Sequence, residues 1–186
     1  HDSFGAGHAS TSVSAAVGLA TADALAGKTN YTVAVAGDGA FTGGMIYEAL
    51  NNIAEQKLRL IVVLNDNDMA IDHNIGGINR YISRLSTSTR YLGLKYHIKK
   101  FFGAIPLVGR PLTVMCRGIK NFIKRLVWRD NMFENLGLNY YGPVDGYNIK
   151  RLQGVFKDAM RDKKSSIIHV RTVKGKGYTP AEQQPE

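Results

Sequence analysis

Short apolar runs alternate along the chain with segments in which apolar residues recur every three or four positions. The runs at residues 31–36 and 58–64 have the length and β-branched content of buried strands. The segment between them has helical spacing, with apolar positions at Met45, Ile46, Ala49, Leu50 and Ile53. Thr42 is placed to cap this helix and Glu48 falls on its polar side. The order predicts a β-α-β unit with parallel, adjacent strands.

Two further helices and a strand extend this pattern. Residues 10–26 form an alanine-rich segment whose small face suits close packing on a sheet. Near the other end, a helix carries an apolar face of Ile149, Leu152, Val155, Phe156 and Ala159. It leads into a strand at 166–171, in which we expect His169 to pack in the core, whereas 142–146 are typical of a turn and loop. The predicted fold class is α/β, a parallel sheet flanked by helices.

Two polar motifs follow the first two predicted strands. Gly37-Asp38-Gly39 and Asn65-Asp66-Asn67 should therefore meet at the carboxyl edge of the sheet, where open α/β sheets bind ligands. Asp38 and Asn67 offer oxygen ligands that suit Mg²⁺ beside a diphosphate. Main-chain N–H groups of Gly39 and Ala40 are expected to bind phosphate oxygens at a helix start. Each motif alone is a common turn or loop; together they favour a diphosphate-and-metal site.

The chain is similar to the 1-deoxy-D-xylulose-5-phosphate synthase family, transketolase-like enzymes with a thiamine-diphosphate-binding fold. The resemblance rests on blocks at residues 7–12, 37–40, 48–51, 64–69, 133–137, 142–146 and 174–178. It covers nearly the whole chain and is weakest between about 81 and 132. The family implies thiamine diphosphate and Mg²⁺ as cofactors.

The resemblance also implies a set of site residues. The metal ligands would be Asp38, Asn67 and the main-chain carbonyl of Met69. The cofactor contacts would be Gly7, His8, Ala9, Gly39, Ala40, Asn67 and Tyr178. The sequence departs from the family pattern at Ala9, where serine is common, and at Tyr147, where histidine is common.

The implied reaction condenses pyruvate with glyceraldehyde 3-phosphate, with loss of carbon dioxide, in isoprenoid-precursor, thiamine and pyridoxal biosynthesis. The family suggests a homodimer in a bacterial cytoplasm, with a plastid as the alternative. Its activating glutamate belongs to a second domain, so no catalytic residue is assigned to this chain. Glu48 is expected on a helix face and Glu134 in a polar loop. Residues 1–186 are expected to be one partial domain of a longer enzyme, inactive alone.

Other functions remain open at this point. Transketolase and the decarboxylating component of a 2-oxoacid dehydrogenase would share the metal motif, but the blocks at 142–146 and 174–178 argue against both. A non-catalytic binding module, or one half of a split enzyme, would also suit a partial domain. For the cations and glycines of 174–177, the two readings are an anion contact and a solvated exit loop.

The formal net charge of +9 comes largely from residues 80–129, where basic and aromatic side chains mix. Such mixing suits nucleic acid or a membrane surface, yet charge alone argues for solubility and steering. We expect a variable basic insertion at 81–132, largely helical or mobile, that attracts anionic substrates, with neither nucleic acid nor membrane as a partner. The single cysteine, Cys116, excludes an internal disulfide framework. No apolar run approaches the roughly 20 residues that cross a bilayer.

Overall fold

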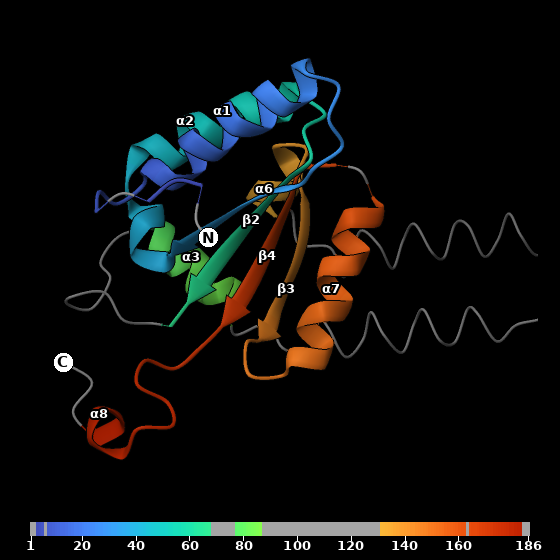
Figure 1. Cartoon of the computed structure of the whole chain (residues 1–186). Coiled ribbons are helices and arrows are strands. Elements are labelled where there is room, and N and C mark those ends of the chain that lie inside the picture. Colours follow the sequence, from blue (N-terminus) through green and yellow to red (C-terminus); the bar gives the residue numbers. More distant parts are fainter. Residues whose placement is uncertain (1–2, 6, 68–76, 87–130, 163, 184–186) are drawn as a thin grey trace, which may run out of the picture.

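A parallel sheet forms the centre of the molecule. The structure, a computed structural model, describes residues 3–5, 7–67, 77–86, 131–162 and 164–183. Within these residues four parallel strands lie in the order β1-β2-β4-β3 (Figure 1). Their bounds are β1 Thr32–Gly37, β2 Leu60–Asp66, β3 Asn139–Asp145 and β4 Ser166–Arg171. The predicted strands are confirmed, and β1 and β2 run on into the two polar motifs.

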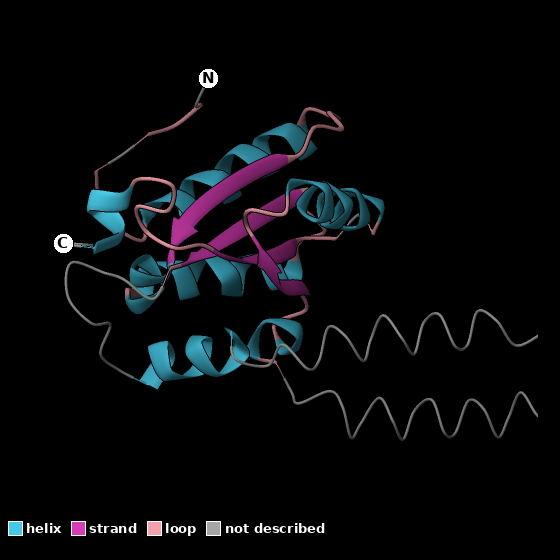
Figure 2. Ribbon diagram, turned by 90° about the horizontal axis from the view of Figure 1, so that it is seen from below, coloured by secondary structure: helices cyan, strands magenta, loops and turns pink. Residues whose placement is uncertain are grey.

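Helices cover both faces of this sheet, as parallel sheets require. One face carries α1 (Thr11–Leu25), the 3₁₀ helix η1 (Asp38–Thr42), α2 (Gly44–Glu55), α3 (Gly77–Ser86) and α6 (Met132–Asn135). The other face carries α7 (Ile149–Arg161), and α8 (Thr179–Gln183) lies beyond the carboxyl ends of the strands (Figures 1 and 2). The predicted α/β fold, a parallel sheet between helices, is therefore confirmed.

The alternation of side chains along the strands divides the core into two layers. Val62, Leu64 and Ile167 pack under α1, α2 and α6, whereas Ile61 and Ile168 face α7. Strand β2 is buried along almost its whole length, because it lies in the middle of the sheet between covered faces. Its continuous Leu-Ile-Val-Val-Leu run is the sequence signature of that position.

The prediction that Thr42 caps the second helix is wrong. The chain makes a 3₁₀ turn after β1, and α2 begins after it with Gly43 at its N-cap. The Thr42 hydroxyl donates instead to the carbonyl of Gly39, at 2.7 Å, within that turn. Gly39 and Ala40 consequently lie in η1 rather than at the start of α2.

Two other local predictions are also wrong. Glu134 lies in the short helix α6, half-buried, rather than in a polar loop. Residues 142–145 belong to β3 rather than to a turn. Pairing of β3 with β4 is interrupted between Tyr141 and Val144, and a cis peptide joins Gly142 to Pro143 at this irregularity. An edge strand tolerates proline at such a bulge, because proline donates no ladder hydrogen bond.

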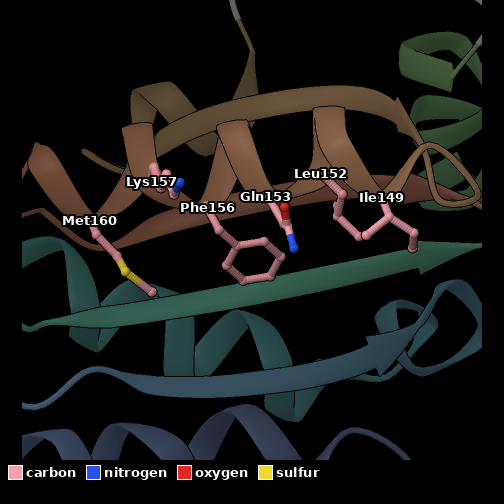
Figure 3. Close-up of a pocket in the computed structure, with 6 residues that line it drawn as sticks. All are labelled: Ile149, Leu152, Gln153, Phe156, Lys157 and Met160. Atoms are coloured by element: carbon pink, nitrogen blue, oxygen red, sulfur yellow. The ribbon is translucent and has the colours of Figure 1, made fainter.

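Helix α7 is amphipathic as predicted, with Ala159 fully buried against the sheet and Leu152, Val155 and Phe156 partly buried. Ile149 differs from the prediction and is 59 % exposed. A groove of about 530 Å³ runs along the helix. Figure 3 shows the residues that line it, Ile149, Leu152, Gln153, Phe156, Lys157 and Met160. The helix thus covers its half of the sheet and leaves an apolar flank beside it.

The basic segment predicted at 81–132 lies mostly outside the described residues, and the described parts at its two ends are helical, in α3 and α6. In the part of the chain that the structure describes, no helix combines the length and apolarity that a membrane span requires.

Candidate functional site

The two polar motifs lie side by side at the carboxyl ends of β1 and β2. Gly37 pairs with Asn65 at the end of the parallel ladder, so Asp38 follows one strand where Asp66 and Asn67 follow the other. The Asp38 side chain is buried, with 3 % exposure, and Asn67 is half-buried. The predicted convergence of the two motifs is therefore present in the fold. Met69, the third predicted metal ligand, lies outside the described residues.

Ser10 ties the predicted loop at residues 7–9 to this edge of the sheet. Its hydroxyl donates to the carbonyl of Ala40 at 2.6 Å, across 30 residues of sequence. The Thr11 hydroxyl in turn donates to the carbonyl of His8, at 2.9 Å. Gly7, His8 and Ala9, all exposed, are thereby held beside η1, which carries Gly39 and Ala40. Sequence reasoning missed Ser10, although α1 begins at Thr11, as its pattern predicted.

Replacing Ser10 with alanine should lower the free energy of unfolding by about 1–2 kcal/mol, because the carbonyl of Ala40 loses its partner. Ser10 has a φ of 70°, in the left-handed region that glycine adopts without strain. Ser10→Gly removes the same hydroxyl but relieves that strain, so it should cost less than Ser10→Ala. Urea unfolding of the two variants checks both values. Equal losses would show that the backbone at Ser10 carries no strain.

Glycines differ in what surrounds them at this edge. A Cβ atom at Gly43 would lie 2.1 Å from the Ser10 hydroxyl, so that glycine is required by packing. A Cβ atom at Gly7 or Gly37 would meet no described atom within 4 Å. Exposed glycines elsewhere, such as Gly154, also have open surroundings. Gly37 is distinguished by the residue that follows it, Asp38, whose side chain is buried.

A tyrosine fixes the helical turn that carries this part of the site. The Tyr47 hydroxyl donates to the carbonyl of Phe41, at 2.6 Å. Burial raises the pKa of Tyr47 to about 12, so the hydroxyl remains protonated and able to donate throughout the neutral range. This hydrogen bond anchors the end of η1 to α2, and Phe41 itself is fully buried.

The segment after β4 contains Tyr178 and the predicted anion-contact residues. Tyr178 is 65 % exposed and directly precedes α8, which lies on the side of the sheet to which the strands point (Figure 1). The Lys176 ammonium lies 3.8 Å from the ring centroid of Tyr147. The Tyr147 hydroxyl donates to the carbonyl of Val173, at 2.7 Å, and accepts from its N–H, at 2.9 Å. Tyr147, one of the departures from the family pattern, therefore fastens this segment to the end of β3.

A buried row of three polar side chains crosses the sheet next to the site. Nε2 of His169 lies 2.8 Å from a carboxylate oxygen of Asp66, and its Nδ1 lies 2.6 Å from the Tyr140 hydroxyl. His169 is fully buried, as predicted, but it is hydrogen-bonded rather than merely packed. The signal in the sequence was a histidine inside an apolar strand, since a buried imidazole needs partners.

The donor set fits magnesium held together with a diphosphate. Among the described residues, no three His, Cys, Asp or Glu side chains lie close enough to hold a metal alone. Mg²⁺ that binds with a substrate or cofactor phosphate needs only one or two protein carboxylates. Asp38, with the amide of Asn67 after the neighbouring strand, matches this requirement.

Comparison with known proteins gives the family. A family model described as 1-deoxy-D-xylulose-5-phosphate synthase matches residues 1–172. The chain belongs to this family. The synthase of Thermomicrobium roseum is 46% identical over 185 residues, which are 100% of this chain and 29% of that protein. The synthase of Caldanaerobacter subterraneus is 46% identical over 186 residues, 100% of this chain and 30% of that protein.

One solved structure that matches this chain at a distance is that of a Mycobacterium smegmatis protein, described as a putative thiamin diphosphate-dependent enzyme. The match covers 90% of this chain and 23% of that protein's chain, with 19% sequence identity and a TM-score of 0.48. The chain thus spans about 30% of the length of the synthases that it matches.

Proposed function

We propose that this chain is the part of a 1-deoxy-D-xylulose-5-phosphate synthase that holds the diphosphate of thiamine diphosphate through Mg²⁺. The observation that carries the proposal is the strand register, which sets Asp38 beside the segment of Asn67 at one edge of the sheet. The hydrogen bond from Ser10 to Ala40 brings the predicted loop at residues 7–9 to the same edge.

Each predicted residue has a role in this proposal. The carboxylate of Asp38, the amide oxygen of Asn67 and the main-chain carbonyl of Met69 hold the cation. The main-chain N–H groups of Gly39 and Ala40 bind the diphosphate, and glycine at position 37 lets it approach the backbone.

The remaining contacts lie around this core of the site. Gly7, His8 and Ala9 contact the cofactor from the loop before α1, and Tyr178 contacts it from the segment after β4. Ala9 has no hydroxyl, so it contributes its main chain only. When bound, thiamine diphosphate supplies the nucleophilic carbon for decarboxylation of pyruvate.

The activity of the whole protein follows from the family as part of this proposal. It is a transferase that joins pyruvate to glyceraldehyde 3-phosphate with loss of carbon dioxide, acting as a homodimer in the cytoplasm. The activating glutamate of the family belongs to a second domain, so that role is assigned neither to Glu48, which is exposed on α2, nor to Glu134 in α6. We therefore expect binding, rather than turnover, from the 186 residues alone.

Calorimetric titration of thiamine diphosphate tests the binding site. We expect the protein to bind the cofactor with Mg²⁺ present and to lose binding in EDTA. Asp38→Ala should weaken Mg²⁺-dependent binding at least about 100-fold, because the cation loses its charged ligand. Glu48→Ala, which removes an exposed carboxylate from the neighbouring helix, is the matched control and should bind as the wild type does. Binding that survives Asp38→Ala in a folded protein would contradict the proposed site.

A further inference from the structure

A hydrogen-bonded row of buried side chains links β2 with the two strands beyond it in the sheet, β4 and β3. Tyr140 of β3, His169 of β4 and Asp66 of β2 have exposures of 9 %, 0 % and 3 %. Phe133 of α6 stacks on the Tyr140 ring, with centroids 5.9 Å apart and an interplanar angle of 8°. The row therefore begins in the apolar core and ends at the segment of residues 65–67, which we name the β2 exit segment.

The chemistry of the three groups gives the row a direction. An ionised carboxylate only accepts hydrogen bonds, so the Nε2–H of His169 donates to Asp66. In the tautomer that carries its proton on Nε2, Nδ1 is the acceptor and the Tyr140 hydroxyl donates to it. Each member has a partner of the matching kind, which fixes both the tautomer and the orientation of the imidazole.

A second contact from the end of β4 reaches the same segment. The Thr172 hydroxyl donates to the side-chain oxygen of Asn65, at 2.8 Å. The Thr172 N–H donates to the carbonyl of Asp66, at 2.9 Å. The β2 exit segment is thus held at the Asn65 side chain, the Asp66 carboxylate and the Asp66 backbone, directly before Asn67.

Stability alone does not account for a polar row in this place. Burying a carboxylate, an imidazole and a phenol costs solvation, and apolar side chains of similar volume often give an equally stable core. The row lies among apolar residues of the α1 and α2 side of the sheet, such as Leu64 and Ile167. Polar groups in metal sites commonly orient the residues that bind the metal, and their removal costs 10–100-fold in affinity.

We propose that His169 is a positioning residue for the metal-and-diphosphate site: it holds Asp66, and through Asp66 it sets the backbone from which Asn67 serves the cation. The inference rests on the proposed function for its ligand, although the ordering of the β2 exit segment is measurable without any ligand. Tyr140 and Thr172 are the supporting members.

Two substitutions of His169 in the full encoded polypeptide test the proposal. The side-chain amide of His169→Gln lies near the Nε2 position and keeps a hydrogen-bond donor for Asp66. The amide of His169→Asn lies near the Nδ1 position and leaves Asp66 without a donor from residue 169. We expect His169→Asn to weaken Mg²⁺-dependent binding of thiamine diphosphate by about tenfold or more. His169→Gln should stay within about threefold of the wild type. Ile168→Ala, on the opposite face of β4, is the control for general destabilisation and should leave the affinity unchanged.

Hydrogen exchange without cofactor gives an independent measurement. His169→Asn should speed amide exchange in residues 65–67 by about tenfold relative to Ile168→Ala, because the segment loses its anchor. If the wild type binds no cofactor but this exchange result holds, the proposed function fails, and only the ordering of the β2 exit segment by His169 stands. Equal affinity and equal exchange in folded His169→Asn would overturn the positioning role. If His169→Asn does not fold, the same two measurements are made on Tyr140→Phe and Thr172→Val. Wild-type affinity and wild-type exchange in both of these variants would overturn the positioning role.

Discussion

Replacing Gly142 with alanine should lower the free energy of unfolding by about 2–5 kcal/mol. A Cβ atom at this position would lie 2.6 Å from the carbonyl oxygen and 2.7 Å from the Cβ atom of His169. The φ of Gly142 is 143°, in a region that side chains other than glycine rarely adopt. The clash cannot be relieved by a small side-chain movement, because the two neighbouring atoms are the main-chain oxygen and the Cβ atom of a residue in an inner strand.

The matched control for this substitution is Gly154→Ala. Gly154 lies inside α7, and a Cβ atom there would meet no described atom within 4 Å. Alanine is the better helix former, so this variant should gain about 0.5–1 kcal/mol. Urea unfolding of both variants measures the effect of the same glycine-to-alanine change, which we expect to lower the free energy of unfolding at position 142 and to raise it at position 154. A loss at Gly142 no larger than about 0.5 kcal/mol would show that β3 can move away from His169.

Truncating Phe133 to alanine should cost about 3–5 kcal/mol, the usual range for a buried phenylalanine. The ring is fully buried among three others, with Phe41 and Tyr81 edge-on at centroid distances of 6.2 and 6.3 Å and Tyr140 stacked at 5.9 Å. Removing it leaves a cavity at the base of the row that ends at Asp66. The unfolding midpoint in urea measures the loss.

Phe133→Leu separates the loss of volume from the loss of the stacked ring. Leucine retains most of the volume, so it should cost roughly half as much as alanine. The helix that carries Phe133 is held independently, since the Asn131 side chain accepts from the Phe133 N–H at 3.0 Å. A cost below about 1 kcal/mol for Phe133→Ala would mean that neighbouring side chains collapse into the space.

The sequence predicted those parts of the fold in which one pattern determined the outcome. The runs at 31–36 and 58–64 became β1 and β2 because they combine strand length with polar ends, and the parallel crossover between them followed from the helix in the middle. The adjacency of Gly37 and Asn65 was a consequence of that topology. The roles of the site residues themselves stay predictions until the titration is made.

Other features depended on contacts between distant parts of the chain. Proline in 142–146 suggested a turn, and only its place at an edge of the sheet allows it inside β3. The short turn before α2 displaced the cap from Thr42 to Gly43, where Ser10 leaves no room for a side chain. The hydrogen bond between His169 and Asp66 spans 103 residues of sequence, so no local sequence pattern predicts it.

The place of β4 in the sheet has a consequence for how the protein is made. Of the four described strands it is synthesised last, yet it lies between β2 and β3 and pairs with both. The unit of β1, α2 and β2 can form early from local contacts, but β3 must wait for its neighbour while synthesis proceeds from the N-terminus. The carboxylate of Asp66 likewise gains its hydrogen bond to His169 only after β4 has been synthesised. A nascent chain released before Arg171 would therefore contain both polar motifs without the strand that orders them.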